Sequence, residues 1–224
     1  MTTHDHISAA RFEAGAFRRL ARRRLADAPA LAIADIDGRP RLAPSDFDLN
    51  PDFIVHAPPA LARPAAVLVP VVARDPLTVL FTLRTPHLKA HAGQVSFPGG
   101  KVENSDTGPA DTALREAEEE IGLERGLVEP LGFLDTYRTG TGYAVMPLVA
   151  LVDPGYRARP DPNEVADVFE VPLGFLMEPA NARLETRFWR GADRRYYALT
   201  YDARDIWGAT AGMLRNMRER LFGE

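Results

Sequence analysis

The chain has 224 residues and contains no cysteine. That absence excludes disulfides, a thiol nucleophile and a zinc–thiolate site. No apolar run approaches the ~20 residues that a helix needs to cross a bilayer, so no membrane partner is expected. The opening stretch, MTTHDHISAARFEAG, lacks the basic-then-apolar order of a secretory signal. We therefore expect a cytoplasmic protein.

Excess charge is also small, because 27 basic residues face 31 acidic ones, a net charge of −4. This balance gives no general attraction to nucleic acid, and no nucleic-acid partner is expected. Residues 8–25 are predicted to form an amphipathic helix that carries the one dense basic cluster. We interpret this cluster as a solvated helix face, with a phosphate- or partner-binding arm as the alternative. Its members are Arg18, Arg19, Arg22, Arg23 and Arg24.

The length suits one domain with extensions, and such a chain can bury a large core. Residues 38–64 contain six prolines and little periodicity, which indicates a linker wrapped over the core. We expect residues 1–63 to form an N-terminal helix and this linker, and residues 64–224 to form the main domain. Hydrophobic patterns in that domain predict strands and helices in alternation. We expect strands at 66–72 (interrupted by Pro70), 78–84, 128–137, 143–152 and 165–171, a short helix at 172–177, a hairpin of 187–189 with 196–200, and a last helix at 205–221.

The segment from residue 109 to residue 122 has the signals of a complete helix. Pro109 suits a first helical position, and Gly122 suits the left-handed residue just past the end. At about 100° per residue, Glu116, Glu119 and Glu120 share one side of this helix, next to the buried stripe. The stripe consists of Ala110, Ala113, Leu114, Ala117 and Ile121.

The middle of this helix, REAEEEIG at 115–122, places four carboxylates in five positions. Each like-charged i,i+4 pair costs a few tenths of a kcal/mol, and a divalent cation would offset that repulsion. Mg²⁺ prefers a few carboxylates and leaves its other positions to water and substrate phosphates. Glu116, Glu119 and Glu120 supply such a partial cage. The alternative is a solvated acidic helix with intrahelical pairs, such as Arg115 with Glu119.

Residues 93–123 resemble the Nudix box, in which a Gly, five residues, a Glu and seven residues precede Arg-Glu-aliphatic-x-Glu-Glu-x-Gly-aliphatic. Here Gly100 is followed by five residues and Asp106, and eight residues then lead to REAEEEIGL at 115–123. Two features depart from the general box: Asp106 replaces Glu, and the spacer is one residue longer. Both look like features of the coenzyme A pyrophosphatases, a Nudix subfamily.

Residues 80–100, LFTLRTPHLKAHAGQVSFPGG, resemble the upstream signature of that subfamily. Lys89 stands where the signature has Arg, and it keeps the charge but lacks the planar fork. A third similarity is IWGATA at 206–211, so the resemblance spans roughly residues 64 to 220. It implies a Nudix-type α/β/α sandwich with a mixed β-sheet, plus an N-terminal helical extension, and a homodimer as a family-based expectation. The matched positions are Leu80, Thr82, Arg84, Gly93, Phe97, Pro98, Gly99 and Gly100.

The resemblance also implies a reaction, hydrolysis of a diphosphate with Mg²⁺ or Mn²⁺. A bound ion neutralises the anionic oxygens and lowers the pKa of a bound water, and a carboxylate accepts the proton. Glu116 and Glu120 are expected to be the main metal pair, and Glu119 is a further ligand or the base. Arg115 is expected to orient Glu119. Glu164, in the loop DPNEVADVF, is an alternative base, against a capping role.

Coenzyme A carries a 3′-phosphate as well as its diphosphate, so additional cations are expected. Gly99 and Gly100 allow a sharp turn that would bring main-chain N–H groups to metal or phosphate, although Gly99 also suits a plain structural turn. A basic set precedes this turn, with surface placement as the alternative for each member. It consists of Arg84, His87, Lys89 and His91.

Three function classes follow from these features. The first is a hydrolase that splits coenzyme A or a derivative into 3′,5′-ADP and 4′-phosphopantetheine. The second is a Nudix hydrolase of another diphosphate, such as ADP-ribose, NADH or a nucleoside triphosphate. The third is a catalytically silent module that binds a nucleotide. The complete carboxylate set argues against the third class, and the signature at 80–100 favours the first over the second.

Overall fold

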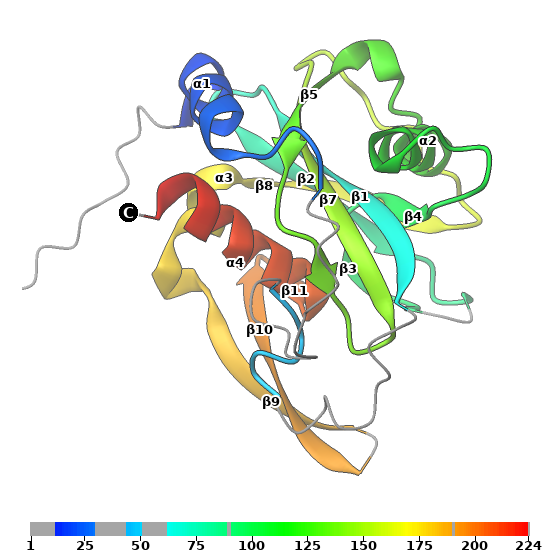
Figure 1. Ribbon diagram of the computed structural model, residues 1–224, viewed down its shortest axis with the longest axis vertical. Coiled ribbons are helices and arrows are strands. Elements are labelled where there is room, and N and C mark those ends of the chain that lie inside the picture. The colour runs from blue at the N-terminus through cyan, green and yellow to red at the C-terminus, as the bar shows by residue number, and fades with distance from the viewer. Residues whose placement is uncertain (1–11, 30–43, 51–61, 89–90, 190, 224) are drawn as a thin grey trace, which may run out of the picture.

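The computed structural model describes residues 12–29, 44–50, 62–88, 91–189 and 191–223. Its centre is a mixed eight-stranded sheet with the main order β3-β2-β1-β7-β5. Helix α2 covers one face, and helices α1 and α4 cover the other (Figure 1). This is the α/β/α sandwich expected from the sequence. Among the described residues, no helix combines the length and apolar character that a membrane crossing requires.

The two central strands, β1 (Arg63–Val72) and β7 (Tyr143–Val152), run parallel over their full length. Both are long apolar runs, as expected for strands that are covered on both faces. The expected interruption of the first strand at Pro70 is wrong. β4 pairs with β1 at residues 65–67 and β2 pairs with it at 71–72, so Pro70 lies between these two ladders and interrupts neither.

The other strands of the sheet pair antiparallel with their neighbours. Strand β2 has the predicted bounds, whereas the predicted strand 128–137 is divided into β5 and β6. These strands are β2 (Thr78–Arg84), β3 (Val95–Ser96), β4 (Gly99–Lys101), β5 (Val128–Phe133), β6 (Tyr137–Arg138) and β8 (Val165–Pro172).

Helix α2 (Pro109–Ile121) has its predicted bounds, with Pro109 in the first turn and Gly122 left-handed at φ 64°. Ala113, Ala117 and Ile121 are fully buried against the sheet, as the predicted stripe requires. Helix α3 (Leu173–Met177) is the expected short helix. Helix α1 (Ala14–Arg24) lies within the predicted range 8–25, and residues 8–11 of that range lie outside the described residues.

The C-terminal region differs from the expectation in one respect. The last helix, α4 (Ala209–Phe222), begins four residues later than predicted. Residues Arg204–Trp207 instead form β11, which pairs with β10 (Ala192–Tyr201). Gly208, at φ 63°, separates this strand from the helix. With β9 (Arg183–Trp189), these strands form a separate three-stranded sheet, and both hairpin strands are longer than predicted.

Of the expected linker, 38–64, the structure describes residues 44–50 and 62–64, and Arg63 and Pro64 belong to β1 rather than to a linker. Lys89 lies outside the described residues. Ser45 forms a bridge with Arg138 of β6. The side chain of Asn50 accepts a hydrogen bond from the main-chain N–H of Arg195 and donates one to its carbonyl, both at 2.9 Å. This segment therefore contacts the main sheet and β10 at once, while the division at residue 63 stays a prediction.

Candidate active site

The loop between β4 and α2 is organised around the carboxylate of Asp106. Its oxygens accept hydrogen bonds from Arg115 Nε at 2.8 Å, Arg115 Nη2 at 3.1 Å, the N–H of Glu103 at 2.8 Å and Thr112 Oγ1 at 2.7 Å. The Asp106 side chain is only 2% exposed. The Arg115 guanidinium and these donors hold the pKa of Asp106 well below its ordinary value. This carboxylate therefore fixes the entry to α2 and the direction of Arg115.

Arg115 connects this loop to helix α2. Its Nη1 donates to Glu116 Oε1 and to Glu119 Oε2, both at 3.0 Å. The predicted pair of Arg115 with Glu119 is thus present, but it is Asp106 that Arg115 binds in a bidentate manner. Glu119 is held on the outer side of the helix, and its side chain is 60% exposed.

Glu120 occupies the most enclosed position of the three glutamates. It is 3% exposed, accepts a hydrogen bond from the N–H of Gly99 at 3.3 Å, and lies 3.5 Å from Arg84 Nη1. Burial raises the pKa of Glu120 to about 8; Arg84 opposes this rise, and the nearby negative charge of Glu116 adds to it. Arg84 and the Gly99 N–H offset only part of the cost of burying the Glu120 charge, so a cation beside this carboxylate would be favourable.

The two glycines of the turn have separate structural roles. A Cβ on Gly99 would lie 2.4 Å from the carbonyl oxygen of Ala66, so Gly99 allows β4 to approach β1. A Cβ on Gly100 would lie 2.3 Å from Glu116 Oε1. Gly100 therefore leaves the space that the Glu116 carboxylate occupies, and the N–H of Gly99 donates a hydrogen bond to Glu120.

Glu164 reaches this region through a loop that is anchored to the end of α2. The N–H of Arg159 donates to the carbonyl of Ile121, and the N–H of Asp161 donates to that of Glu120, both at 2.9 Å. The side chain of Glu164 is exposed and, among the described residues, makes no capping hydrogen bond. Its negative charge contributes to the raised pKa of both Glu116 and Glu120.

The described members of the predicted basic set, Arg84, His87 and His91, lie in different surroundings. Arg84, at the end of β2, lies beside Glu120, and its buried Nε has no hydrogen-bond partner within the described part of the chain. His87 is exposed, with Nε2 3.0 Å from the carbonyl of Asn163 in the Glu164 loop. His91 is exposed and contacts Gln94 at 2.8 Å. Only Arg84 of the described members therefore lies against the carboxylates.

The carboxylates of this region have some of the features of a divalent-ion site, but not all of them. Glu116, Glu120 and Glu164 influence one another electrostatically, and Gly100 leaves room beside Glu116. Over the described ranges, however, no three acidic or imidazole groups converge into a metal-binding group. Glu119 is bonded to Arg115 and its side chain is 60% exposed, and Glu120 lies 3.5 Å from Arg84 Nη1.

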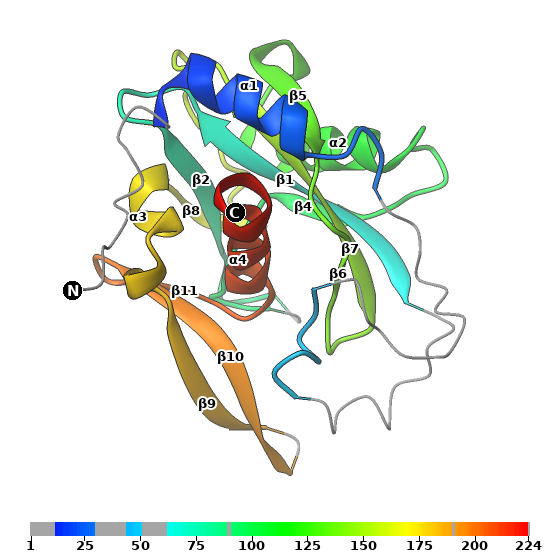
Figure 2. The ribbon, with the colours of Figure 1, turned by 60° about the vertical axis from the view of Figure 1, so that its left-hand side comes forward.

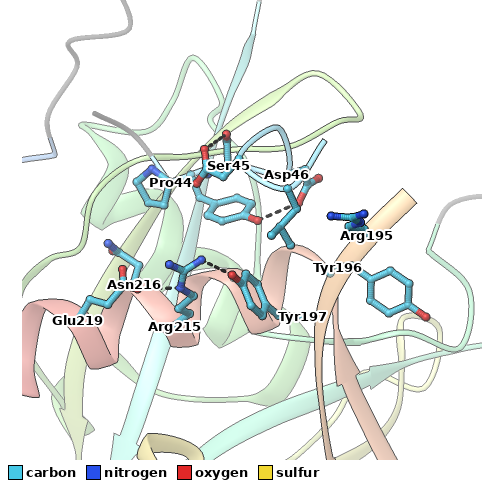
Figure 3. Close-up of a pocket in the computed structure, with 14 residues that line it drawn as sticks. Pro44, Ser45, Asp46, Arg195, Tyr196, Tyr197, Arg215, Asn216 and Glu219 are labelled. Atoms are coloured by element: carbon cyan, nitrogen blue, oxygen red, sulfur yellow. Dashed lines mark hydrogen bonds and ion pairs between the residues drawn. The ribbon is translucent and has the colours of Figure 1, made fainter. Parts of the chain in front are cut away.

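A separate pocket of about 60 Å³ lies between residues 44–50, β6, β10 and α4 (Figure 3). Asp46 accepts hydrogen bonds there from the Tyr137 hydroxyl and the N–H of Gly140, both at 2.8 Å. Burial raises the pKa of Asp46. Tyr137 belongs to the core cluster on the α4 face, opposite the cluster that contains α2. None of the predicted site residues lines this pocket.

Sequence reasoning did not identify Asp161 or the loop contacts that bring Glu164 to α2. These contacts are main-chain hydrogen bonds across about forty residues of chain, which carry no side-chain signature. It also did not identify the partners of Asp106, although the box itself pointed to that position.

Comparisons with known proteins identify the family of the chain. A family model described as the NUDIX domain matches residues 62–194, more than half of the chain. NudL of Escherichia coli O6:H1, named as an uncharacterised Nudix hydrolase, is 40% identical over 155 residues, which cover 69% of this chain and 81% of NudL. NudL of Yersinia enterocolitica, named in the same way, is 39% identical over 162 residues, covering 70% and 80%.

Among solved structures, DR0079 from Deinococcus radiodurans matches with a TM-score of 0.47 and 15% identity, covering 75% of this chain and 89% of its own. The domain match and the extent of the NudL relatives decide the family: the chain belongs to the Nudix hydrolases.

Proposed function

We propose that this protein is a metal-dependent hydrolase that cleaves the diphosphate bond of coenzyme A or a derivative. The products are 3′,5′-ADP and 4′-phosphopantetheine. The observation that carries the proposal is the buried Glu120 carboxylate, held between Arg84 and the Gly99 N–H, directly after a sequence signature that resembles the coenzyme A pyrophosphatases.

Glu116 and Glu120 would hold Mg²⁺ or Mn²⁺. When bound, such an ion neutralises phosphate charge and lowers the pKa of a coordinated water. Gly100 keeps the main chain close to Glu116, and the Asp106–Arg115 contact fixes the helix that carries both ligands. These features support a site that is ordered before substrate arrives.

The chain offers two candidates for the general base. Glu119 accepts a hydrogen bond from Arg115 Nη1 at 3.0 Å, and its side chain is held on the outer side of the helix. Glu164 is exposed, has no capping bond in the described part of the chain, and its negative charge acts on Glu116 and Glu120. Glu164 is therefore the better supported acceptor of the water proton.

The guanidinium of Arg84 is the best supported contact to the diphosphate. Its buried Nε has no partner in the described residues, and its Nη1 makes only a 3.5 Å contact with Glu120. A diphosphate oxygen would supply the charge-assisted hydrogen bonds that this side chain lacks. The 3′-phosphate is assigned to the rest of the basic set, which includes His87 and His91.

A substrate panel with product identification tests the proposal. Coenzyme A, dephospho-coenzyme A, ADP-ribose, NADH and a nucleoside triphosphate are compared with Mg²⁺ and with Mn²⁺. We expect 3′,5′-ADP and 4′-phosphopantetheine from coenzyme A. Dephospho-coenzyme A should show a raised KM with less change in kcat, because the 3′-phosphate binds alike in the ground and transition states. Faster turnover of ADP-ribose or a triphosphate would support the second function class instead.

A further inference from the structure

The outer edge of β9 is unpaired in the three-stranded sheet. The strand order is β11-β10-β9, and β9 pairs with β10 along its whole length. Within the part of the chain that the structure describes, no strand pairs with the other edge of β9. Figure 2 shows the β9–β10 ribbon projecting from the body of the protein. An open strand edge presents main-chain donors and acceptors that can pair with another strand.

Two large apolar side chains are exposed along this strand. Leu184 is 54% exposed and Phe188 is 71% exposed. They lie two positions on either side of Thr186, so all three occupy the same face of the strand. The β10 residue opposite Leu184 is Tyr197, which contacts Arg215 of α4. The exposed apolar side chains thus extend the sheet face that packs on α4.

The sequence of β9, RLETRFW, is self-complementary when two copies run antiparallel about Thr186. In that register Glu185 lies opposite Arg187 of the second copy, and Leu184 lies opposite Phe188. Two-fold symmetry repeats each pair. Opposite charges and apolar side chains that face each other across strands stabilise such a pairing.

Neighbouring registers are unfavourable. A shift of two residues in one direction places Glu185 opposite Glu185, and the same shift in the other direction places Arg187 opposite Arg187. Like charges directly opposite are destabilising. A shift of one residue moves the apolar side chains to opposite faces. The pattern of β9 therefore specifies one register, which is what a specific contact between two copies requires.

We propose that two copies of this chain associate through the outer edges of β9, antiparallel and centred on Thr186. The two three-stranded sheets then form one continuous sheet. This interface uses no residue of the carboxylate site, so it stands or falls independently of the proposed hydrolase activity.

Charge reversal tests the register. Sedimentation velocity over a protein concentration series should show a dimer for the wild type, and monomers for Glu185→Arg and for Arg187→Glu. An equimolar mixture of the two variants should form a heterodimer, because each Arg then faces a Glu. The double variant should form a homodimer again. A wild type that stays monomeric, single variants that still dimerise, or a mixture that stays monomeric would each overturn the proposal.

The mixture also controls for folding, because Glu185 makes contacts within its own chain. It bonds to Arg183 at 3.0 Å and accepts from the Tyr196 hydroxyl at 3.1 Å. A variant that had lost its fold through these contacts would not regain association when mixed with its counterpart.

Cross-linking gives a second, direct measurement, since the chain has no cysteine. Thr186→Cys places two sulfurs across the symmetry axis, where opposite Cβ atoms are about 4.5–5.5 Å apart, close to the range of disulfides. Mild oxidation should convert this variant to a covalent dimer, whereas Glu124→Cys, at an exposed position elsewhere, should form little covalent dimer although its β9 edge is intact. Equal cross-linking of the two variants would contradict the proposed interface.

Discussion

Arg115 binds Asp106 through two nitrogens, with Nε 2.8 Å from Oδ1 and Nη2 3.1 Å from Oδ2. Its third nitrogen, Nη1, donates hydrogen bonds to Glu116 and Glu119. One side chain thus connects the loop after β4 to two of the predicted site carboxylates. Because the fork geometry of Arg permits this sharing, the direction of Glu116 and Glu119 depends on Arg115, which Asp106 holds in place.

The first prediction concerns this contact. Asp106→Asn weakens the bidentate interaction with Arg115. It should lower activity by about 10–100-fold, as expected for a residue that helps to orient proposed metal ligands. Steady-state kinetics measures the loss. Asp111→Asn is the matched control, because Asp111 lies nearby in the first turn of α2 and pairs with Arg125 instead. Equal losses in both variants would show that the Asp106 contact has no special role.

A pH prediction follows from the same carboxylate. The pKa of Asp106 is lowered in the folded protein, so its contribution to stability is present above the unfolded pKa, about 3.9. That contribution is lost as the pH falls through the lower folded value. Urea unfolding should therefore show a difference between wild type and Asp106→Asn at pH 7 that shrinks below about pH 4. A difference that grows on acidification would contradict the assignment.

Gly100→Ala should act through Glu116. A Cβ at this position would lie 2.3 Å from Glu116 Oε1 and must displace that carboxylate. We expect a loss of at least tenfold in kcat/KM, comparable with loss of ligand support, with the circular dichroism spectrum retained. Gly126→Ala is the control, because a Cβ there meets no atom within 4 Å. Full activity in Gly100→Ala would exclude a role for this close approach.

The identity of the base is tested by Glu164→Gln and Glu119→Gln. If Glu164 accepts the water proton, its variant should lose about 10²–10⁴-fold in kcat while binding Mn²⁺ nearly as tightly as wild type. Glu119→Gln should lose less, since its carboxylate is exposed and turned toward Arg115. Kinetics paired with electron paramagnetic resonance of Mn²⁺ separates the two effects. The reverse order of losses would assign the base to Glu119.

The sequence was sufficient where signals are local. Pro109 and Gly122 predicted both ends of α2. The spacing predicted Glu116, Glu119 and Glu120 on one side beside the buried stripe; the Glu116 and Glu120 side chains are largely buried, whereas the Glu119 side chain is 60% exposed. The sequence failed at residues 204–207, because these residues pair with β10 across the tight turn at 202–203 instead of continuing the helical pattern that follows them. Helical spacing also could not show that Glu119, bonded to Arg115, is exposed.

The approach of Glu164 is a further case. Its loop is held by main-chain bonds from Arg159 and Asp161 to the end of α2, and such bonds are independent of side-chain identity. The motif DPNEVADVF suggested a candidate base. The sequence could not show that its loop lies against the end of α2, because about forty residues separate the two segments.

The most direct test of the site compares Glu120→Gln with Glu118→Gln. Glu120 is buried beside Arg84, whereas Glu118 is 51% exposed on the opposite flank of α2. Both variants remove one charge from the same helix. Mn²⁺ affinity, measured by electron paramagnetic resonance, and turnover of coenzyme A are determined for each. We predict that Glu120→Gln weakens Mn²⁺ binding at least tenfold and lowers kcat by at least about 10²-fold, while Glu118→Gln stays close to wild type. A Glu120→Gln variant that keeps wild-type Mn²⁺ affinity and more than about a tenth of wild-type turnover would contradict the account.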